Sequence, residues 1–442
     1  MDRKLIAATL VVACAWTRGA RAQSATNPSP TSEPAARARC EGPLDPAVVV
    51  RCALAASPEV SEARAQRAAV TARRTTAGVW LPSNPTVSGM LAHRRRPPPE
   101  SASVLNWAVT LSQEFEIAGQ RGARVDAVDV EAAAQERRVR VAEQEVAAGA
   151  LTAYYEAVAA QEGLRVASDL VRTADALAAY AEGRAKEAVL AGVEADVARA
   201  EATRIALVRF EAERRVTTAR ATLALLIQTD PGTLALPDSL TAPPAPEGAG
   251  GALEEQALRL RGEVAAAEME RTVLERRLTV VRRERIPNLT VSAFAEQGEI
   301  NDRILGVGLS VPIPLPAPVG RTRAGEIAET IAQIHAAESS AELVRRRVRI
   351  EVARATSAYR ARAGATRLFA GDLLARARAD LSALREAIGA RQLSLREALT
   401  WQRSLIELLQ ADIEVRLGSA LASVELRRVA GLPLSTSPGG RQ

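Results

Sequence analysis

The distribution of proline limits the folds open to this chain more than any other feature. The chain has 23 prolines, but none lies from Glu100 through Asp230 or from Val319 through Leu432. A proline inside a helix costs about 3 kcal/mol, so very long helices can form in these two stretches. Both stretches are also rich in Ala, Glu, Arg, Leu and Gln, which favour the helical backbone. We therefore predict a mainly helical protein.

Each proline-free stretch is interrupted once by a glycine-containing segment, Glu182–Arg184 in the first and Ile388–Arg391 in the second. These interruptions predict two helical hairpins with arms of about 45–60 residues, or about 65–90 Å at 1.5 Å per residue. The return arm of the second hairpin carries a heptad pattern, which predicts lengthwise packing against neighbouring helices. Its positions are Leu395, Leu399, Gln402, Ile406, Leu409 and Ile413.

Four short segments alternate apolar residues with polar or small ones, which is the pattern of β-strands with two different faces. Two strands precede each hairpin: Thr86–Ala92 and Leu105–Gln113, then Leu289–Ala295 and Leu305–Val311. One face of such a sheet meets lipid or a protein core, and the other meets something polar. A small solvated sheet is the alternative interpretation.

The two halves of the chain resemble each other. Glu59-Val60 and Thr86-Val87-Ser88 recur 204 residues later as Glu263-Val264 and Thr290-Val291-Ser292. Such self-similarity indicates a tandem duplication of about 200 residues. We expect a signal peptide at 1–22, an extended N-terminal segment at 23–46, a first repeat at 47–229, a proline-rich linker at 230–251, a second repeat at 252–434 and a C-terminal tail at 435–442.

Four strands are too few to close a barrel in a membrane. The smallest familiar barrels have about eight strands, and an open edge in lipid leaves unpaired backbone groups that each cost several kcal/mol. Subunits must therefore share a barrel if the sheet is embedded in lipid. Two subunits give eight strands, whose interior fills with side chains, whereas three give twelve and an aqueous lumen. We therefore expect a homotrimer with a 12-stranded β-barrel and a 12-helix α-barrel below it.

The order of strand pair, long hairpin, proline-rich link, strand pair and long hairpin resembles the TolC-like family of outer-membrane efflux channels. Ala53–Ala72 is similar to the opening helix of that family, and Leu309–Pro314 is similar to the end of its fourth strand. The resemblance covers about Asp45–Leu434 and rests on the order of the motifs, since none of them is diagnostic alone. It implies a passive export duct in the outer membrane with a periplasmic extension.

Within this family, Leu111–Arg124 resembles the stretch LSQPIELGGKRGAR of the cobalt–zinc–cadmium resistance channels. That branch implies a tripartite pump, in which a periplasmic adaptor protein joins the channel to a proton-driven inner-membrane exporter. It also implies divalent heavy-metal cations as cargo. Organic solutes or drugs are the alternative cargo, because the few Met and His residues give cations no independent support.

The N-terminus has the layout of a secretory signal peptide. Arg3 and Lys4 precede an apolar run, and Ala20-Arg21-Ala22 offers a cleavage site before Gln23. A competing cleavage is possible, because Leu10–Cys14 resembles a lipobox that would leave Cys14 as a lipidated terminus. Both interpretations predict export of the chain.

Cys40 and Cys52 are the two cysteines that remain after the leader. In an oxidising compartment an even number of cysteines favours a disulfide, here one that closes a short loop at the start of the fold. Two separate free thiols are the alternative.

Charge and motif content argue against several other functions. The formal charge is +6, but half of it belongs to the leader, and the remaining Arg residues interleave with Glu along helices. We therefore expect no nucleic-acid partner. His93 and His335 are the only histidines, so no metal site or cofactor is predicted. No catalytic constellation is present, and we do not expect an enzyme.

The main alternative from another class is a periplasmic adaptor protein, which also has a leader and a helical hairpin. Proteins of that class have one hairpin framed by two Gly-rich halves, whereas this sequence predicts two hairpins and two strand pairs. A purely structural coiled coil would explain the helices but not the alternating strands.

The resemblance also implies a constriction at the free tips of the hairpins. The family has a motif resembling G-x-x-S-x-x-D-V-L-D-A on the return arm, and its acidic residues in the second copy ring the periplasmic entrance. Arg391–Trp401 stands in that place here, with Glu397 at the first acidic position and Thr400 at the second. Three Glu397 carboxylates would form an anionic ring that favours cations. The alternative is a Glu397 paired with an arginine on the outside of the tube.

Overall fold

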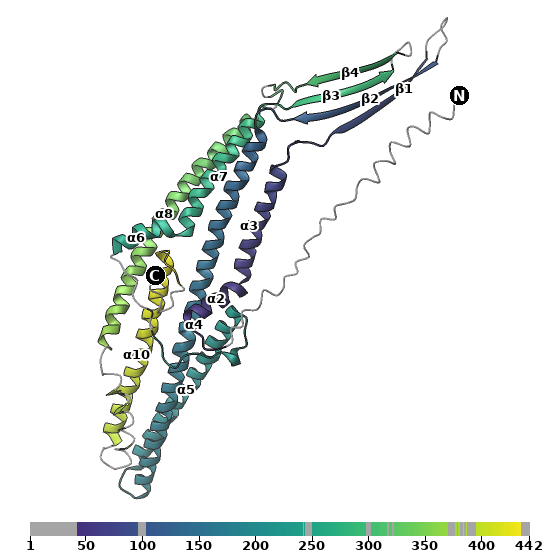
Figure 1. Cartoon of the computed structure of the whole chain (residues 1–442). Coiled ribbons are helices and arrows are strands. Elements are labelled where there is room, and N and C mark those ends of the chain that lie inside the picture. The colour runs from purple at the N-terminus through teal and green to yellow at the C-terminus, as the bar shows by residue number, and fades with distance from the viewer. Residues whose placement is uncertain are drawn as a thin grey trace.

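The computed structural model describes residues 42–95, 103–241, 243, 250–297, 302–315, 318–320, 322–369 and 395–434, with six further residues between 376 and 386. Within these ranges the chain is mainly helical and has one small antiparallel sheet, as predicted. Figure 1 shows an elongated molecule with the sheet at one end and the turn between α4 and α5 at the other.

Four long helices form most of the column. They are α4 (Gln120–Lys186), α5 (Gly192–Ile227), α8 (Ala324–Leu368) and α10 (Leu395–Val429). α4 has 67 residues and is therefore about 100 Å long. The shorter helices are α2 (Pro46–Ala56), α3 (Pro58–Ala77), α6 (Gly250–Leu260), α7 (Gly262–Glu284) and the single 3-10 turn η1 (Pro231–Thr233).

The sheet contains β1 (Thr86–Arg95), β2 (Ser103–Phe115), β3 (Leu289–Gln297) and β4 (Arg303–Ser310) in that order, each antiparallel to its neighbour. All four predicted strands are confirmed within a few residues at their ends. β2 pairs with β3, so the two strand pairs join into one sheet across the two halves of the chain. All four strands connect to helices at the same end of the sheet (Figure 1).

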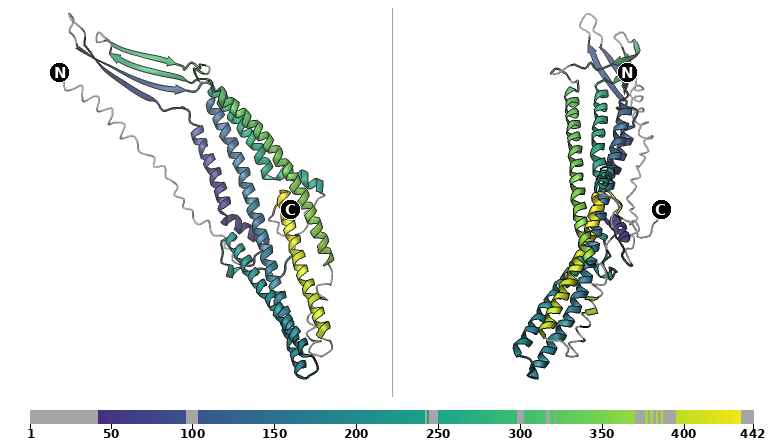
Figure 2. Two further views of the ribbon diagram at one scale, coloured as in Figure 1. Left: turned by 180° about the vertical axis from the view of Figure 1, so that it is seen from behind. Right: turned by 90° about the vertical axis from the view of Figure 1, so that its left-hand side faces the viewer.

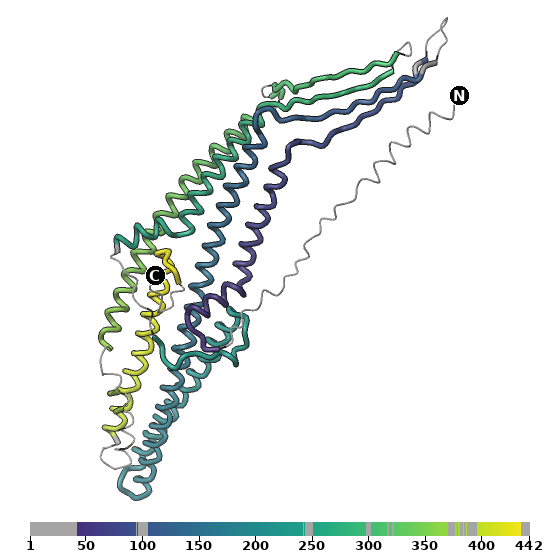
Figure 3. Tube along the Cα trace, viewed as in Figure 1, coloured from purple at the N-terminus to yellow at the C-terminus, as the bar shows by residue number. Residues whose placement is uncertain are grey.

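The helices lie side by side in one layer. In the half nearest the sheet, α4 contacts α3 and α7, and α7 contacts α8, so the order across the layer is α3, α4, α7, α8. Figure 2 shows this half from behind and from the side, and Figure 3 traces the same arrangement along the backbone. A layer one helix thick exposes both of its broad faces, so it has the form of a wall rather than of a bundle around a core.

The reversal of the first hairpin lies beyond the predicted position. The helix continues through Gly183 and ends at Lys186, and the chain turns over the next five residues with Ala188 in the left-handed region at φ 56°. A glycine in a helix costs only about 1 kcal/mol, and the packing of Ala181 and Ala185 near it outweighs that cost. The predicted second reversal at Ile388–Arg391 lies outside the described residues.

The arms of the first hairpin are unequal, contrary to the prediction of similar lengths. α5 has 36 residues against 67 in α4, because it stops at Ile227 with Gln228 in the left-handed conformation. Where α5 is missing, α3 and α7 pack against α4 instead. The shorter helices thus complete the half of the wall nearest the sheet.

The two halves use the same local geometry. α6 begins and ends 204 residues after α2 (250 against 46 and 260 against 56). Gly119 before α4 and Arg323 before α8 are also 204 residues apart, and both are left-handed, with φ 71° and 54°. Glycine suits position 119 because of this left-handed backbone, and a Cβ there would displace the Arg283 guanidinium, whose Nη1 would lie 2.5 Å away. Arg323 tolerates this conformation while its side chain contacts Glu284 at 3.1 Å.

A buried cluster of charges joins the two halves midway along the column. Arg416 of α10 contacts Glu162 of α4 at 2.8 Å and Asp412 at 2.6 Å, and Nη1 also donates to the Leu240 carbonyl. Glu162 in turn accepts from the Leu240 amide at 3.0 Å. Removing one member of such a buried pair costs about 3–5 kcal/mol because the other charge stays buried. This cluster fixes α10 and the linker against α4.

Cys52 lies in α2, is buried in the core shared with α4, and is disulfide-bonded. Cys40 lies outside the described residues, so the pairing of Cys40 with Cys52 stays a prediction. We expect oxidised protein to show no free thiol after denaturation, and reduction to lower the free energy of unfolding by about 3 kcal/mol through the released loop. Thiol labelling before and after reduction measures the pairing, and Cys52→Ala serves as the unbridged reference. Ready labelling of both cysteines without reductant would contradict it.

Candidate functional site

The sheet has one apolar face that none of the described residues covers. Val87 lies opposite Leu111, which lies opposite Ala293, which in turn lies opposite Val307, so one apolar row crosses all four strands. Val307 is 84% exposed. The other exposed apolar side chains of this face are Leu91, Leu105, Val109, Phe115, Leu305 and Leu309. Contiguous exposed apolar surface of this kind marks contact with a partner or with lipid.

The opposite face of the sheet carries mostly small or polar side chains, with Met90, Phe294 and Ile304 as its larger apolar members. The row next to Val87 joins Thr86, Ser112, Ser292 and Gly308, and the hydroxyls of Thr86 and Ser112 lie 2.7 Å apart. A Cβ at position 308 would lie 2.7 Å from Oγ of Ser292, so a larger residue in this row would displace the serine hydroxyl. The predicted alternation of an apolar and a polar face is therefore confirmed.

Both outer strands of the sheet lack a partner on one side. β1 pairs only with β2, and β4 pairs only with β3, among the strands that the structure describes. Each outer strand therefore presents a row of backbone N–H and C=O groups to a further strand. The protomer is complete as a folded unit but incomplete as a sheet.

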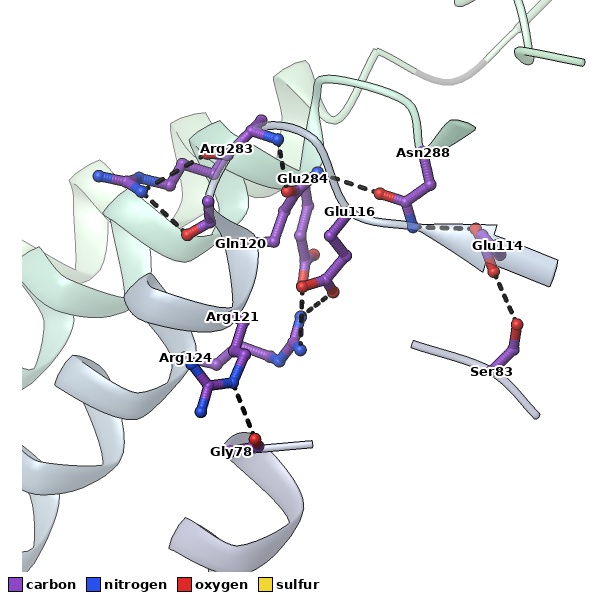
Figure 4. Close-up of polar contacts among 12 residues, drawn as sticks. Gly78, Ser83, Glu114, Glu116, Gln120, Arg121, Arg124, Arg283, Glu284 and Asn288 are labelled. Atoms are coloured by element: carbon purple, nitrogen blue, oxygen red, sulfur yellow. Dashed lines mark hydrogen bonds and ion pairs between the residues drawn. The ribbon is translucent and has the colours of Figure 1, made fainter. Parts of the chain in front are cut away.

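A hydrogen-bonded junction fixes the angle between sheet and helices (Figure 4). The side chain of Gln120 is almost fully buried, and its Nε2 donates to the Ile286 carbonyl at 3.3 Å and to Oδ1 of Asn288 at 3.0 Å. Asn288 Nδ2 then donates to Oε1 of Glu114 at 2.9 Å. The Gln120 side chain also accepts from the Ala118 amide at 2.9 Å. The start of α4, the end of β2 and the start of β3 thus move as one body.

Three arginines reinforce this junction, as Figure 4 also shows. Arg124 forms an ion pair with Glu116, whose side chain is nearly buried. Arg283 of α7 donates to the Gly119 carbonyl at 2.9 Å. Arg121 donates through Nε to the Gly78 carbonyl at 2.8 Å, which ties the end of α3 to α4. The sequence motif Leu111–Arg124 therefore builds the strand-to-helix junction.

At the far end of the column, one charge cluster holds the two hairpins together. Glu201 of α5 is bound by Arg204 of the same helix at 2.6 Å and by Arg403 of α10 at 3.0 Å. Its side chain is only 6% exposed. The hydrogen bonds from Arg204 and Arg403 outweigh the effect of burial and lower the pKa of Glu201 to about 2. Arg403 is therefore a direct link between α10 and the first hairpin.

The predicted heptad face of α10 is buried at Gln402, Ile406, Leu409 and Ile413, which confirms its lengthwise packing. Gln402 is 1% exposed, and neither atom of its amide has a hydrogen-bond partner. A polar residue in a heptad core costs stability and restricts the register of the helices. The seam close to Arg403 is thus less stable than an apolar one.

Glu397 lies in the first turn of α10 and is exposed. Arg391–Ser394 lie outside the described residues. The anionic ring of Glu397 side chains therefore stays a prediction. Cys14 also lies outside the described residues. Sequence reasoning missed Glu201 and Arg416, because nothing in their spacing distinguishes them from the many Glu–Arg pairs on helix faces.

The described residues contain neither a membrane-spanning helix nor a cluster of metal ligands. No helix among them has both the length and the apolar character of a membrane span. No group of three or more His, Cys, Asp or Glu side chains in this part of the chain is arranged to hold a metal ion.

Comparison with solved structures shows the same fold in bacterial outer-membrane channels. The outer-membrane channel OprN matches with a TM-score of 0.68 and 20% identity, over 88% of this chain and 90% of that one. CusC matches with a TM-score of 0.68 and 15% identity, over 87% of this chain and 91% of that one. VceC of Vibrio cholerae matches with a TM-score of 0.65 and 17% identity, over 87% of this chain and 96% of that one.

One curated protein matches at the level of sequence. The nickel-cobalt-cadmium resistance protein NccC of Alcaligenes xylosoxydans xylosoxydans is 30% identical over 308 residues, which cover 67% of this chain and 66% of that protein. The chain therefore has the fold of these outer-membrane proteins and is similar in sequence to NccC. No protein-family profile matches the sequence.

Among these neighbours, OprN is an outer-membrane channel and CusC forms a transmembrane channel. The alignment with NccC stops just short of two thirds of that protein. Cargo, assembly partners and subunit number are therefore argued below as proposals.

The pKa of Glu201 predicts an acid-sensitive contact between the hairpins. Because this pKa falls from 4.5 to about 2, the contact contributes its full stability above pH 4.5 and loses it as the pH falls toward 2. In Glu201→Gln that loss should disappear, and α10 should exchange its backbone hydrogens faster at neutral pH. Hydrogen exchange of residues 395–406 across this pH range measures both effects.

Glu211 provides a matched control for this experiment. Its pKa is also lowered to about 2, first by its hydrogen bond with Arg214 and then by Arg215, but both partners lie on α5 itself. Glu211→Gln should therefore leave exchange in α10 unchanged. Equal effects of the two substitutions would rule out a role for Glu201 in joining the hairpins.

Proposed function

We propose that this chain is the outer-membrane channel subunit of a tripartite efflux pump, and that three copies share one 12-stranded β-barrel. The exposed apolar face of the sheet carries this proposal. A face with Val307 84% and Leu305 82% exposed would be strongly unfavourable in water but suits the hydrocarbon of a bilayer. The polar face of Thr86, Ser112 and Ser292 then lines the lumen.

The lengths of the strands support the same placement. β1 has 10 residues, β3 has 9 and β4 has 8. A tilted strand of about 9–11 residues crosses the hydrocarbon of a bilayer. The unpaired edges of β1 and β4 would pair with those of neighbouring copies, so that no backbone edge meets lipid.

The helical wall supports a tube below the barrel. A layer one helix thick, in the order α3, α4, α7, α8, becomes the wall of a closed tube when three copies surround one axis. Twelve helical segments then enclose a duct that continues the lumen of the barrel. This assembly would cross the periplasm as a passive path for solutes.

We propose divalent heavy-metal cations as the cargo of this duct. The support is the similarity to a nickel-cobalt-cadmium resistance protein and the resemblance of Leu111–Arg124 to the same branch. The partners would be a periplasmic adaptor protein and a proton-driven inner-membrane exporter. Organic solutes remain the alternative cargo, and lipid attachment at Cys14 remains the alternative to complete removal of the leader.

Cross-linking across the open edges tests the trimer. Ser88→Cys on β1, combined with single cysteines along residues 303–310 of β4, should give disulfides between subunits at one register of the scan. The products in native membranes should stop at three subunits, because pairing of the last edge closes the ring. A product of four or more subunits would contradict a trimer.

A matched control uses strands that already pair within the protomer. Cysteines at Leu111 of β2 and Ala293 of β3 lie opposite each other in one chain, so they should form no bond between subunits. Covalent dimers from this pair would show that the method traps random collisions rather than the closed barrel.

Glu397 is predicted to contribute to cation selectivity. Three Glu397 side chains at the entrance would attract cations, so Glu397→Ala should reduce the cation-to-anion permeability ratio and Glu397→Lys should reduce it further. Single-channel recording of the reconstituted trimer measures the ratio. Glu407, exposed on another face of α10, is the control, and Glu407→Ala should change nothing. Unchanged selectivity in both Glu397 variants would place this residue outside the duct.

The cargo is tested in a bacterial strain that lacks its own metal-efflux channel. Production of this chain with a cation exporter and its adaptor should raise the tolerated concentrations of nickel, cobalt and cadmium several-fold. Tolerance to organic toxicants should stay unchanged. The reverse pattern would assign the channel to organic solutes and leave its architecture intact.

A further inference from the structure

Trp80 is an exposed aromatic side chain directly below the sheet. It lies between α3 and β1 and is 77% exposed, and Val79 and Leu81 beside it are exposed as well. Exposed Ile286 and Ile313 lie in the other connections between helices and strands at this end of the sheet. We call this set of exposed apolar residues between the helices and the sheet the junction collar.

The guanidinium group of Arg121 packs over the Trp80 ring. The guanidinium carbon of Arg121 lies 4.1 Å from the centroid of the ring, and Nε of Arg121 donates to the Gly78 carbonyl at 2.8 Å. Such a contact positions the ring and the cation together. Nε is thus occupied, whereas the two terminal nitrogens retain donors that can reach outward.

Arg121 has no carboxylate partner among the described residues. Glu116 of the same junction is bound by Arg124. An arginine that stacks on an aromatic ring and keeps free N–H groups is well suited to a phosphate, which it can bind through two parallel hydrogen bonds. Arg282 and Arg285, exposed at the end of α7, add positive charge to the same level of the molecule.

The depth of the junction collar fits the surface of a bilayer. β1 begins at Thr86, six residues after Trp80, and its 10 residues suit the hydrocarbon layer. Trp80 therefore lies just outside this layer on the side of the helices. Tryptophan is enriched at this level of membrane proteins, because its ring is apolar and its N–H can reach water or a headgroup.

We propose that Trp80 and Arg121 bind the phosphate groups of phospholipids in the periplasmic leaflet of the outer membrane. The indole ring contacts the upper part of the acyl chains, and the terminal nitrogens of Arg121 donate to the phosphate oxygens. The junction network that carries Arg121 would thereby fix the sheet at one depth. This proposal rests on the proposed membrane position of the sheet, and its test separates the two.

Depth-dependent quenching of tryptophan fluorescence provides the test. The chain has Trp16, Trp80, Trp107 and Trp401, so three variants are made that each keep one of the last three and carry phenylalanine at the others. Each is reconstituted as the full channel into phosphatidylcholine vesicles. The lipids carry bromine either near the carbonyl end of the acyl chains or near the terminal methyl.

We expect three different results. Trp80 should be quenched more strongly by bromine near the carbonyl end than by bromine near the methyl. Trp107, which lies opposite Leu91 in mid-sheet, should show the reverse order. Trp401 is 56% exposed near the far end of the column and should be unaffected by either lipid.

The controls distinguish the two ways of failing. Quenching of Trp107 without quenching of Trp80 would overturn the lipid site alone, including the case in which a neighbouring subunit covers Trp80. The absence of quenching at both positions would overturn the membrane position of the sheet and the lipid site with it.

Retention of phospholipid tests the part of Arg121. Native mass spectrometry of the detergent-extracted channel should show fewer bound phospholipids in Arg121→Gln and in Trp80→Ala than in the unmodified protein, with Arg121→Lys intermediate because it keeps charge but not the planar fork. Arg214→Gln, an exposed arginine of α5, is the matched control and should retain the full number. Equal retention in all variants would overturn the role of Arg121.

Discussion

The continuity of α4 is the constraint on which the rest of this structure depends. Its 67 residues contact α3 and α7 in the half nearest the sheet, α2 near mid-height, and α5 and α10 toward the other end. A proline anywhere in its interior would cost about 3 kcal/mol and bend the column. Because the helix is unbroken, the junction at Gln120 and the cluster at Glu201 are attached to one rigid rod. The position of the sheet and the position of the hairpin tips are thereby linked through covalent structure.

The duplicated chain uses equivalent positions for different tasks. Ser57 caps α3, and its counterpart 204 residues later is Arg261, a buried arginine that contacts Glu263 at 2.7 Å and Glu351 at 2.5 Å. Gly119 and Arg323 share one left-handed backbone geometry, although only the first position has Arg283 against it. The backbone plan of the two halves is therefore common, while their side chains differ.

The polar interactions along the column form a graded series. Exposed ion pairs such as Arg64 with Glu143 join α3 to α4 and contribute at most about 1 kcal/mol each. The Arg416 cluster is buried and joins both halves at mid-height. Near the tips, Glu201 is buried but its arginines are half exposed, and Gln402 beside them lacks partners. The column is thus held most firmly at its middle and less firmly at the end away from the sheet.

The sequence by itself determined the elements and their order. Proline-free runs predicted the long helices, period-two alternation predicted four strands and their two faces, and the heptad of α10 predicted buried Gln402 and Ile406. These signals are local, because they depend on backbone preference and on which side of an element is apolar. The turn at Glu187–Ala191, the short α5 and the pairing of β2 with β3 were decided by tertiary packing. So were the partners of Gln120, Glu201 and Arg416, since residues more than a hundred positions apart come together only when α4 aligns the two halves.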